Sequence, residues 1–330
     1  MTERIPIVLA SDDNYAPFVA TVAYSILDNT QSFVEFYVLD GGITDKSKDK
    51  IRNSLEKFRN FSMDFIDMSR FNLERFPNMR HYTVNMFSRY FIPELLPEKK
   101  KVLYLDVDII AKGDISELYE QELGEYCLGA ILEDFYKDNY QRLKNEIYPE
   151  YKGGSNYFNS GVLLMDIQKL LDGKYVEMLV DTTLKYADLL SCPDQDVFNI
   201  VFENNFKILD YRFNIQIDHI GLLERLSLES AMQAKTNPVL IHYTSKKPWK
   251  SNPNEYPEFW EIVKKTHFCR RIKRMLPESR YSRIVGYYLF GFIPMLEVLN
   301  KENKRVYKIF GIPFIKSKTS SSHKFNCFGG

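Results

Sequence analysis

The chain has 330 residues, 45% of them hydrophobic, with 44 Lys and Arg balanced by 44 Asp and Glu, which is the composition of a globular protein with an ample core. No apolar run is long enough to span a bilayer, and the first one, residues 5–10 followed by two acids, is too short and wrongly flanked for a signal peptide. The four cysteines form no CxxC pair, which argues against a zinc cluster or a disulfide framework and suits a reducing compartment; they are Cys127, Cys192, Cys269 and Cys327.

Apolar runs alternate with helical patterns along the first part of the chain. We expect strands at residues 6–10, 34–39, 62–68, 102–105 and 126–132. Helices are expected from Tyr15 onward and at residues 44–58 and 86–96. This alternation predicts a mostly parallel, doubly wound α/β sheet.

The strand at residues 102–105 ends in Asp106-Val107-Asp108. Alternate residues of an extended chain project to the same side, so the two carboxylates would lie together. A strand's carboxyl end is where open α/β sheets bind ligands, and a divalent cation there would relieve the repulsion between two acids. Asp-X-Asp also recurs by chance on solvated loops, but apolar residues bracket this copy on both sides, which favours a metal site.

The second half continues the pattern, with strands expected at residues 157–166, 206–211 and 239–243 and helices at residues 193–201 and 256–263. Beyond these, residues 264–330 carry 15 basic and 3 acidic side chains, a net charge of +12, whereas residues 1–263 carry −12. The basic segment contains a short repeat, Tyr287–Pro294 and Tyr307–Pro313, which predicts two strand–turn units or one hairpin. Its interleaved aromatic and basic residues favour an anionic bilayer over nucleic acid as a partner, and packing on the main domain is the alternative.

Four stretches in a fixed order carry a family resemblance, with SRY and DQD between them: VLASDDNY (8–15), YLDVD (104–108), YFNSGVLLMD (157–166) and HYTSKKPW (242–249). Together they resemble glycosyltransferase family 8, the retaining, metal-dependent enzymes that include bacterial lipopolysaccharide galactosyl- and glucosyltransferases and the glycogenins. The resemblance implies a GT-A fold, a nucleotide-binding α/β domain over residues 1–263, with residues 264–330 as a membrane-associating appendage. It also implies UDP-glucose or UDP-galactose as donor and Mn²⁺, or alternatively Mg²⁺, as cofactor.

The resemblance further implies which residues bind the metal and the diphosphate. Asp106, Asp108 and His242 match the metal ligands, and two carboxylates with one imidazole suit Mn²⁺ better than Ca²⁺. Val107 matches the residue whose backbone lies near the ribose. Lys247 matches the lysine that reaches the diphosphate, and its neighbour Lys246 could substitute for it.

The remaining residues match positions that line the donor pocket in the family. These positions contact the uridine or the sugar, or lie beneath the sugar. They are Ala10, Asp12, Asn14 and Tyr15 for uridine, Arg89 for holding the donor, Asn159 and Ser160 for the sugar, and Asp194 and Gln195 beneath it. Asp12 and Asn14 could equally cap a helix. Glu133 or Asp134 matches a further acidic position. An amide such as Gln195 is a poor nucleophile, so a front-face reaction is preferred, with double displacement through Asp194 as the alternative.

The function implied is hexosyl transfer to a glycan or lipid-linked acceptor, as in lipopolysaccharide synthesis, by a cytoplasmic enzyme bound peripherally to the inner face of a membrane. A phosphotransferase using the same carboxylate pair is one alternative, but the chain has neither GxxxxGK[ST] nor GxGxxG. A catalytically silent nucleotide-sugar-binding protein is another, and the intact motif residues argue against it.

Overall fold

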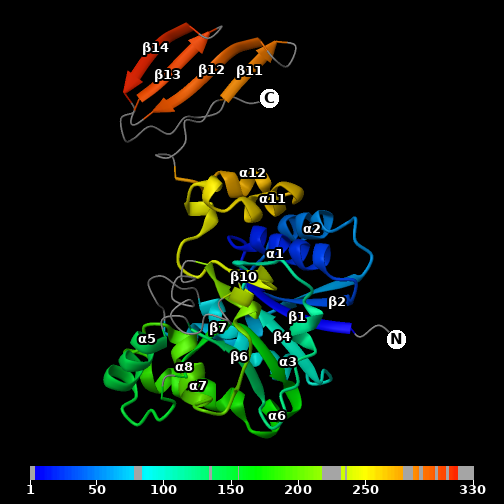
Figure 1. Ribbon diagram of the computed structural model, residues 1–330, viewed down its shortest axis with the longest axis vertical. Coiled ribbons are helices and arrows are strands. Elements are labelled where there is room, and N and C mark those ends of the chain that lie inside the picture. The colour runs from blue at the N-terminus through cyan, green and yellow to red at the C-terminus, as the bar shows by residue number, and fades with distance from the viewer. Residues whose placement is uncertain are drawn as a thin grey trace.

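The computed structural model describes residues 4–77, 84–133, 136–154, 156–217, 232–234, 236–277, 285–289, 293–301, 304–309 and 312–318. Its centre is a seven-stranded sheet with the order β3-β2-β1-β4-β7-β6-β8 (Figure 1). The strands are β1 (Arg4–Ser11), β2 (Phe33–Asp40), β3 (Phe61–Asp67), β4 (Lys101–Leu105), β6 (Leu128–Leu132), β7 (Phe158–Asp166) and β8 (Lys207–Ile208).

Strands β1 to β4 run parallel to one another, which confirms the mostly parallel sheet predicted from the sequence. In contrast, β7 runs antiparallel to both of its neighbours, β4 and β6. The middle of β7 therefore lies beside the end of β4, with Val162 opposite Leu105. Just beyond this pair, the Asp106 N–H donates to the Gly161 carbonyl at 2.8 Å. This antiparallel pairing of β7 with β4 brings the motif at residues 104–108 beside the motif at residues 157–166.

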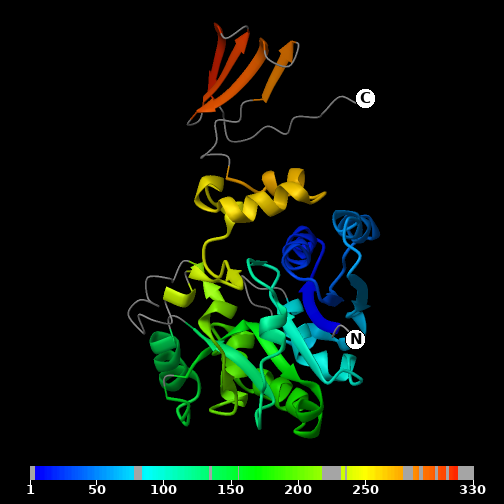
Figure 2. The ribbon, with the colours of Figure 1, turned by 45° about the vertical axis from the view of Figure 1, so that its right-hand side comes forward.

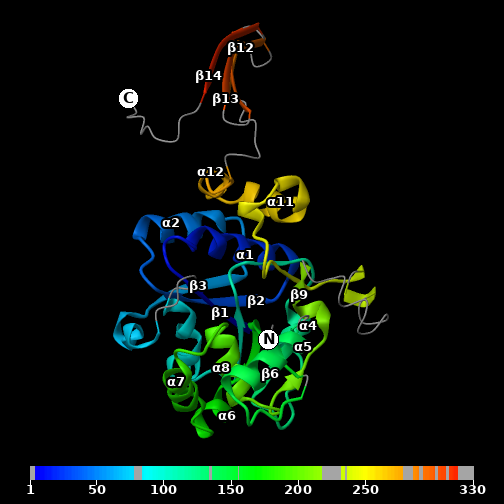
Figure 3. The same cartoon turned by 90° about the vertical axis from the view of Figure 1, so that its left-hand side faces the viewer.

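Helices cover both faces of the sheet, with α1 and α2 on one face and α3, α6, α7 and α8 on the other (Figures 1 and 3). The helices are α1 (Ala16–Asn29), α2 (Asp45–Ser54), α3 (Ile92–Leu95), α4 (Ser116–Tyr119), α5 (Tyr136–Arg142), α6 (Ile167–Asp172), α7 (Tyr175–Tyr186), α8 (Pro193–Val201), α11 (Pro257–Lys265) and α12 (Cys269–Lys273). Single turns of other helix types are the 3₁₀ helices Ser69–Phe71, Leu73–Arg75, Pro248–Lys250 and Pro253–Glu255 and the π-helical turn Leu143–Ile147.

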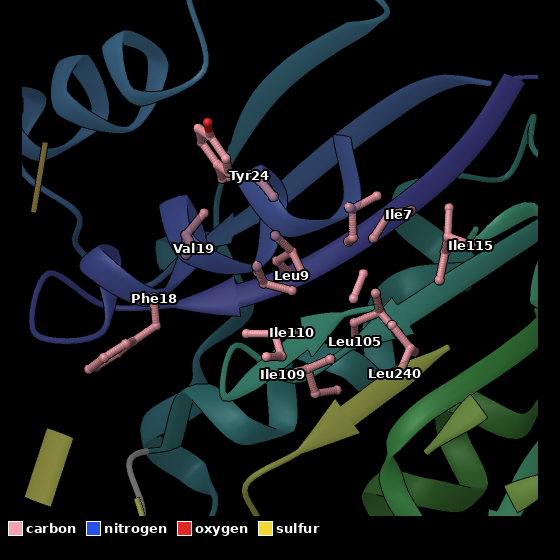
Figure 4. Packing of buried hydrophobic residues seen from close by; sticks show 14 of the residues in the cluster. Ile7, Leu9, Phe18, Val19, Tyr24, Leu105, Ile109, Ile110, Ile115 and Leu240 are labelled. Atoms are coloured by element: carbon pink, nitrogen blue, oxygen red, sulfur yellow. The ribbon is translucent and has the colours of Figure 1, made fainter. Parts of the chain in front are cut away.

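Two hydrophobic cores lie on the two faces of the sheet. Because side chains alternate along a strand, Ile7 and Leu9 of β1 enter one core and Val8 enters the other. Figure 4 shows Ile7 and Leu9 in the first core with Val19 of α1. Helix α1 is apolar around most of its circumference because it is covered by the sheet below it and by α11 above it (Figure 2).

A small second sheet has the order β5-β10-β9 and consists of β5 (Ile109–Ala111), β10 (Leu240–His242) and β9 (Ile215–Gln216). β10 pairs antiparallel with β5, which places His242 opposite Ile109. The Tyr243 N–H then donates to the Asp108 carbonyl at 3.0 Å. This pairing carries His242 to the carboxyl end of β4 from a distant part of the chain.

Two predicted elements differ in the structure. The helix expected at residues 86–96 is a 3₁₀ helix, Val84–Phe91, followed by the single α-helical turn of α3, which Pro93 helps to start. The strand expected at residues 206–211 is only the two residues of β8. The carboxylate of Asp210 accepts the Arg212 N–H at 2.9 Å, and this bond turns the chain into the 3₁₀ helix Tyr211–Phe213.

Past α11, the chain continues as α12, whose Ile272 is fully buried in the first core together with Phe268. A four-stranded antiparallel sheet follows, with β11 (Val285–Leu289), β12 (Ile293–Lys301), β13 (Lys304–Ile309) and β14 (Ile312–Lys318). In all three ribbon views it lies beyond α11 and α12 (Figures 1 to 3). The repeated sequence forms two strand pairs with the same irregularity, a register shift after Tyr287 and after Tyr307. Within the described ranges, no helix is long and apolar enough to cross a bilayer.

Candidate functional site

Three acidic and imidazole side chains converge at the carboxyl end of β4. One ligand atom from each of Asp106, Asp108 and His242 lies within 4.8 Å of the other two. The Nε2 atom of His242 is 3.1 Å from an Asp108 oxygen and 3.8 Å from an Asp106 oxygen. Two hard oxygen donors and one nitrogen are a donor set that suits a borderline divalent ion. The three residues that the resemblance implied as metal ligands are thus brought together.

Cationic groups compensate both carboxylates. Lys247 Nζ lies 2.5 Å from Asp108, whereas its neighbour Lys246 is exposed. Burial alone would raise the pKa of Asp108, but Lys247 and His242 outweigh it and hold the pKa well below its usual range. Tyr104 donates its hydroxyl hydrogen to Asp106 at 2.7 Å. Asp108 is therefore ready to act as an anionic ligand.

Arg89 connects three parts of the site. Its buried guanidinium lies 2.9 Å from Asp106 and 2.9 Å from Asp194, and it donates to the Ser160 carbonyl at 2.9 Å. The same group stacks over the Tyr104 ring, with 4.3 Å to the ring centroid. Arg89 therefore ties the ends of β4, β7 and α8 to one another, a structural role beyond the donor contact implied by the resemblance.

A hydrogen-bonded amide cluster lies beside this ion-pair network. The side-chain oxygen Oε1 of Gln195 accepts from the side-chain nitrogen of Asn159 at 2.9 Å and from the Ser160 N–H at 3.1 Å. Asn159 and Gln195 both donate to Glu133 at 3.1 Å. Burial raises the pKa of Glu133 despite these two donors. Of the two acidic alternatives, Glu133 thus joins the cluster, and Asp134 lies outside the described residues.

Asp194 is buried in the same region and is held by two partners. Ser160 donates its hydroxyl hydrogen at 3.0 Å to Oδ2 of Asp194, the same oxygen that pairs with Arg89. Burial raises the pKa of Asp194, and Arg89 only partly offsets this effect. Asp194 follows Pro193 at the start of α8, as the sequence predicted.

Gly161 lies at the closest approach of the backbone to the metal-ligand cluster. A β-carbon at this position would lie 2.3 Å from a carbon of the His242 ring and 2.7 Å from an Asp106 oxygen. Real β-carbons do not approach other atoms so closely. The absence of a side chain at Gly161 therefore lets the backbone of β7 lie against His242 and Asp106.

The first and last motifs meet at the amino end of α1. Tyr15 is 39% exposed and stands edge-on to Trp249, 6.4 Å between ring centroids. Asp12 accepts the Tyr15 N–H at 3.0 Å and so closes the turn before α1, but α1 has no side-chain cap, so the helix cap predicted at Asp12 or Asn14 is wrong. Ala10, at the end of β1, is half-buried, and Asn14 is exposed in the turn. Val107, which stands between Asp106 and Asp108 in the chain, is partly buried against the first core.

Asp13 fastens this turn and was not singled out in the sequence. Burial alone would raise its pKa, but hydrogen bonds from Ser47, Thr44 and Arg271 lower the pKa of Asp13 to about 2. Arg271 of α12 also donates to the Asp13 carbonyl at 2.6 Å. A lone Arg in a basic segment gives no signal of such a contact. Tyr104, in contrast, could have been found, because it stands two residues before Asp106 and so faces the same side of β4.

Comparisons with known proteins agree with this geometry. The sequence model of the family described as glycosyl transferase family 8 matches residues 6–253. A Haemophilus influenzae protein provisionally named a glycosyltransferase is 26% identical over 92% of this chain and 88% of its own length. The lipopolysaccharide 1,2-glucosyltransferase of Escherichia coli is 28% identical over 75% of this chain and 73% of its own. The crystal structure of the galactosyltransferase LgtC with donor and acceptor sugar analogues superposes with a TM-score of 0.65 at 25% identity, covering 80% of this chain and 96% of that one.

Proposed function

Because the chain belongs to glycosyl transferase family 8, we propose that it transfers glucose or galactose from a UDP-sugar, with retention of configuration, to a glycan or lipid-linked acceptor. The observation that carries this proposal is the convergence of Asp106, Asp108 and His242 at the carboxyl end of β4. The family match leaves a phosphotransferase without support.

Asp106, Asp108 and His242 would hold Mn²⁺, with Mg²⁺ as the alternative. A divalent cation bound there supplies charge neutralisation for a departing diphosphate. Lys247 adds the chain's own positive charge at the same place, 2.5 Å from Asp108. Tyr15, exposed at the start of α1, offers an aromatic face for the uracil ring.

The state of Asp194 supports a front-face reaction. Its Oδ2 atom is engaged by both Arg89 and Ser160, so an attack on the anomeric carbon by that oxygen would require both contacts to break. Gln195 is fixed by Asn159 and Glu133 and presents an amide rather than a nucleophile. In a front-face reaction the acceptor enters on the leaving-group side, and the departing phosphate takes the acceptor's proton.

The test is UDP release from a panel of UDP-sugars, with Mn²⁺, with Mg²⁺ and in EDTA. Asp108→Asn should nearly abolish release and transfer while the protein stays folded, because one anionic ligand is lost. Asp49→Asn is the matched control, since it makes the same change at an exposed position on α2. Full activity in EDTA, or in Asp108→Asn, would refute the metal assignment.

We also propose that residues 264–330 attach the enzyme peripherally to an anionic membrane on its cytoplasmic face. The register places Lys304 opposite both Lys301 and Lys318, so three lysine positions share one row of the sheet. Residues 264–330 as a whole carry a net charge of +12. Each basic residue near an anionic surface contributes about 1 kcal/mol within a Debye length.

Flotation with anionic vesicles at low and high salt tests the membrane proposal. The sequence suggests truncation after Thr266, with all proposed site residues retained. The burial of Phe268 and Ile272, and the Arg271 bond to Asp13, make a cut after Pro277 the sounder variant. The truncated enzyme should hydrolyse UDP-sugar normally and remain unbound. If the full-length protein also ignores anionic vesicles, the membrane proposal fails.

A further inference from the structure

Asn214 lies between the metal-ligand cluster and the amide cluster, and no motif in the sequence points to it. It directly precedes β9 and is 1% exposed. Its carbonyl oxygen lies 2.9 Å from Nδ1 of His242. Its side-chain nitrogen Nδ2 donates to the side-chain oxygen Oδ1 of Asn159 at 2.9 Å. Asn214 thus contacts a metal-ligand residue on one side and a proposed sugar-binding residue on the other.

The direction of these hydrogen bonds follows from one main-chain group. The Gly161 N–H can only donate, and it donates to the side-chain oxygen Oδ1 of Asn159 at 3.0 Å. That oxygen then faces the amide nitrogen of Asn214, which leaves the Asn214 carbonyl oxygen to face His242. An oxygen without hydrogen can only accept, so Nδ1 of His242 carries the proton.

A second main-chain donor fixes the other end of the chain of bonds. The Ser160 N–H donates to the carbonyl oxygen of Gln195 at 3.1 Å, so that oxygen is an acceptor and also accepts from Asn159 at 2.9 Å. The whole series from Gln195 through Asn159 and Asn214 to His242 therefore has a single consistent polarity. Two adjacent residues of β7 set that polarity.

We propose that Asn214 is a positioning residue that holds His242 with its Nε2 lone pair toward Asp106 and Asp108, and that it couples this nitrogen to the amide pair Asn159 and Gln195. The inference rests on the proposed function, because it takes these residues as metal and sugar sites. Metal-ligating histidines commonly donate their second nitrogen to such a partner, and loss of the partner lowers metal affinity 10- to 100-fold.

Two substitutions of similar size separate the two contacts. Asn214→Leu removes both, so Mn²⁺ affinity measured by titration without nucleotide should fall about 10- to 100-fold. Asn214→Asp keeps an acceptor for the His242 Nδ1–H but loses the donor to Asn159. This variant should retain Mn²⁺ affinity while its KM for UDP-sugar rises. Asn199→Leu is the matched control, equally buried at 1% but bonded to main-chain atoms of Phe158 and Gln195. It should lose stability and keep Mn²⁺ affinity.

A spectroscopic readout reports the ring directly. In ¹⁵N-histidine-labelled protein loaded with diamagnetic Zn²⁺, the His242 signal, identified by its absence in His242→Gln, should show a proton on Nδ1 and metal on Nε2. Metal on Nδ1 would overturn the proposal, as would an Asn214→Leu protein that is folded and binds Mn²⁺ as tightly as the parent. If the parent binds neither ion, the proposed function itself fails, which is a separate outcome.

Discussion

The sharpest prediction concerns a single methyl group at position 161. Gly161→Ala would place a β-carbon 2.3 Å from the His242 ring, 2.7 Å from Asp106 and 3.1 Å from the side-chain oxygen of Asn159. The Gly161 carbonyl accepts the Asp106 N–H at 2.8 Å and the next residue, Val162, pairs with Leu105 of β4, so the backbone has little room to retreat. The side chains facing the new methyl group must move instead.

The size of the movement sets the size of the effect. Carbon atoms in contact are about 3.5–4.0 Å apart, so the His242 ring would have to shift by more than about 1 Å. A displacement of about 1 Å in a catalytic site can lower the rate about 100-fold, equivalent to about 2.7 kcal/mol. Overpacking also lowers stability, typically by about 1–3 kcal/mol, which a folded domain of this size can tolerate.

The assay is steady-state sugar transfer, with thermal unfolding measured in parallel. Gly129→Ala on β6 is the control, because its β-carbon would meet the ends of two flexible leucines, Leu123 and Leu209, at 2.8 and 3.0 Å. It should lose some stability and little activity. If Gly161→Ala is folded and its kcat/KM is within a few-fold of the parent's, the argument that this glycine makes room for His242 and Asp106 is wrong.

Three further predictions follow from the buried charges. Arg89→Ala should weaken UDP-sugar turnover far more than UDP binding, and calorimetry showing equal losses for both ligands would contradict this. Burial raises the pKa of Glu133 above its usual 4.5, so the protonated side chain stabilises the fold below pH 4.5 and this stabilisation is lost as the pH rises through the raised pKa. Glu133→Gln cannot lose a proton, so its Tm should fall less between pH 4 and pH 8 than that of the parent. An unchanged pH profile of Tm would count against this reasoning. Arg142→Met leaves the fully buried Asp196 without its cation and should cost about 3 kcal/mol in urea unfolding, whereas a loss below about 1 kcal/mol would mean that other donors suffice.

The sheet and the acidic pair were predictable because they depend on local pattern. Apolar runs of strand length identify β1, β2 and β4, and the two-residue period of a strand already places Asp106 and Asp108 together. His242 has no such local signal, and only its place in a motif pointed to it. What brings it to the site is the pairing of β10 with β5, a contact between distant parts of the chain.

The residues that the sequence did not reveal act through tertiary contacts alone. Nothing in the local sequence distinguishes Asn214 from other asparagines. The pairing of β9 with β10 places it beside His242. The length of β8 was overestimated because the Asp210 carboxylate accepts the Arg212 N–H and turns the chain out of the strand. Arg271 appears in the sequence as one positive charge among many, and only the packing of α12 aims it at Asp13.

The bond between Arg271 and Asp13 also bears on how the protein is made. It joins positions 258 residues apart, so closing it costs more chain entropy than pairing neighbouring strands such as β1 and β2, and we expect it to form after them. At synthesis rates of about 5–20 residues per second, Asp13 leaves the ribosome roughly 13–50 s before its partner. During that interval the strands that build β1, β2 and β4 can pair while the turn beyond β1 is still unfastened. A nascent chain would therefore acquire its sheet first and an ordered turn between β1 and α1 only near the end of translation.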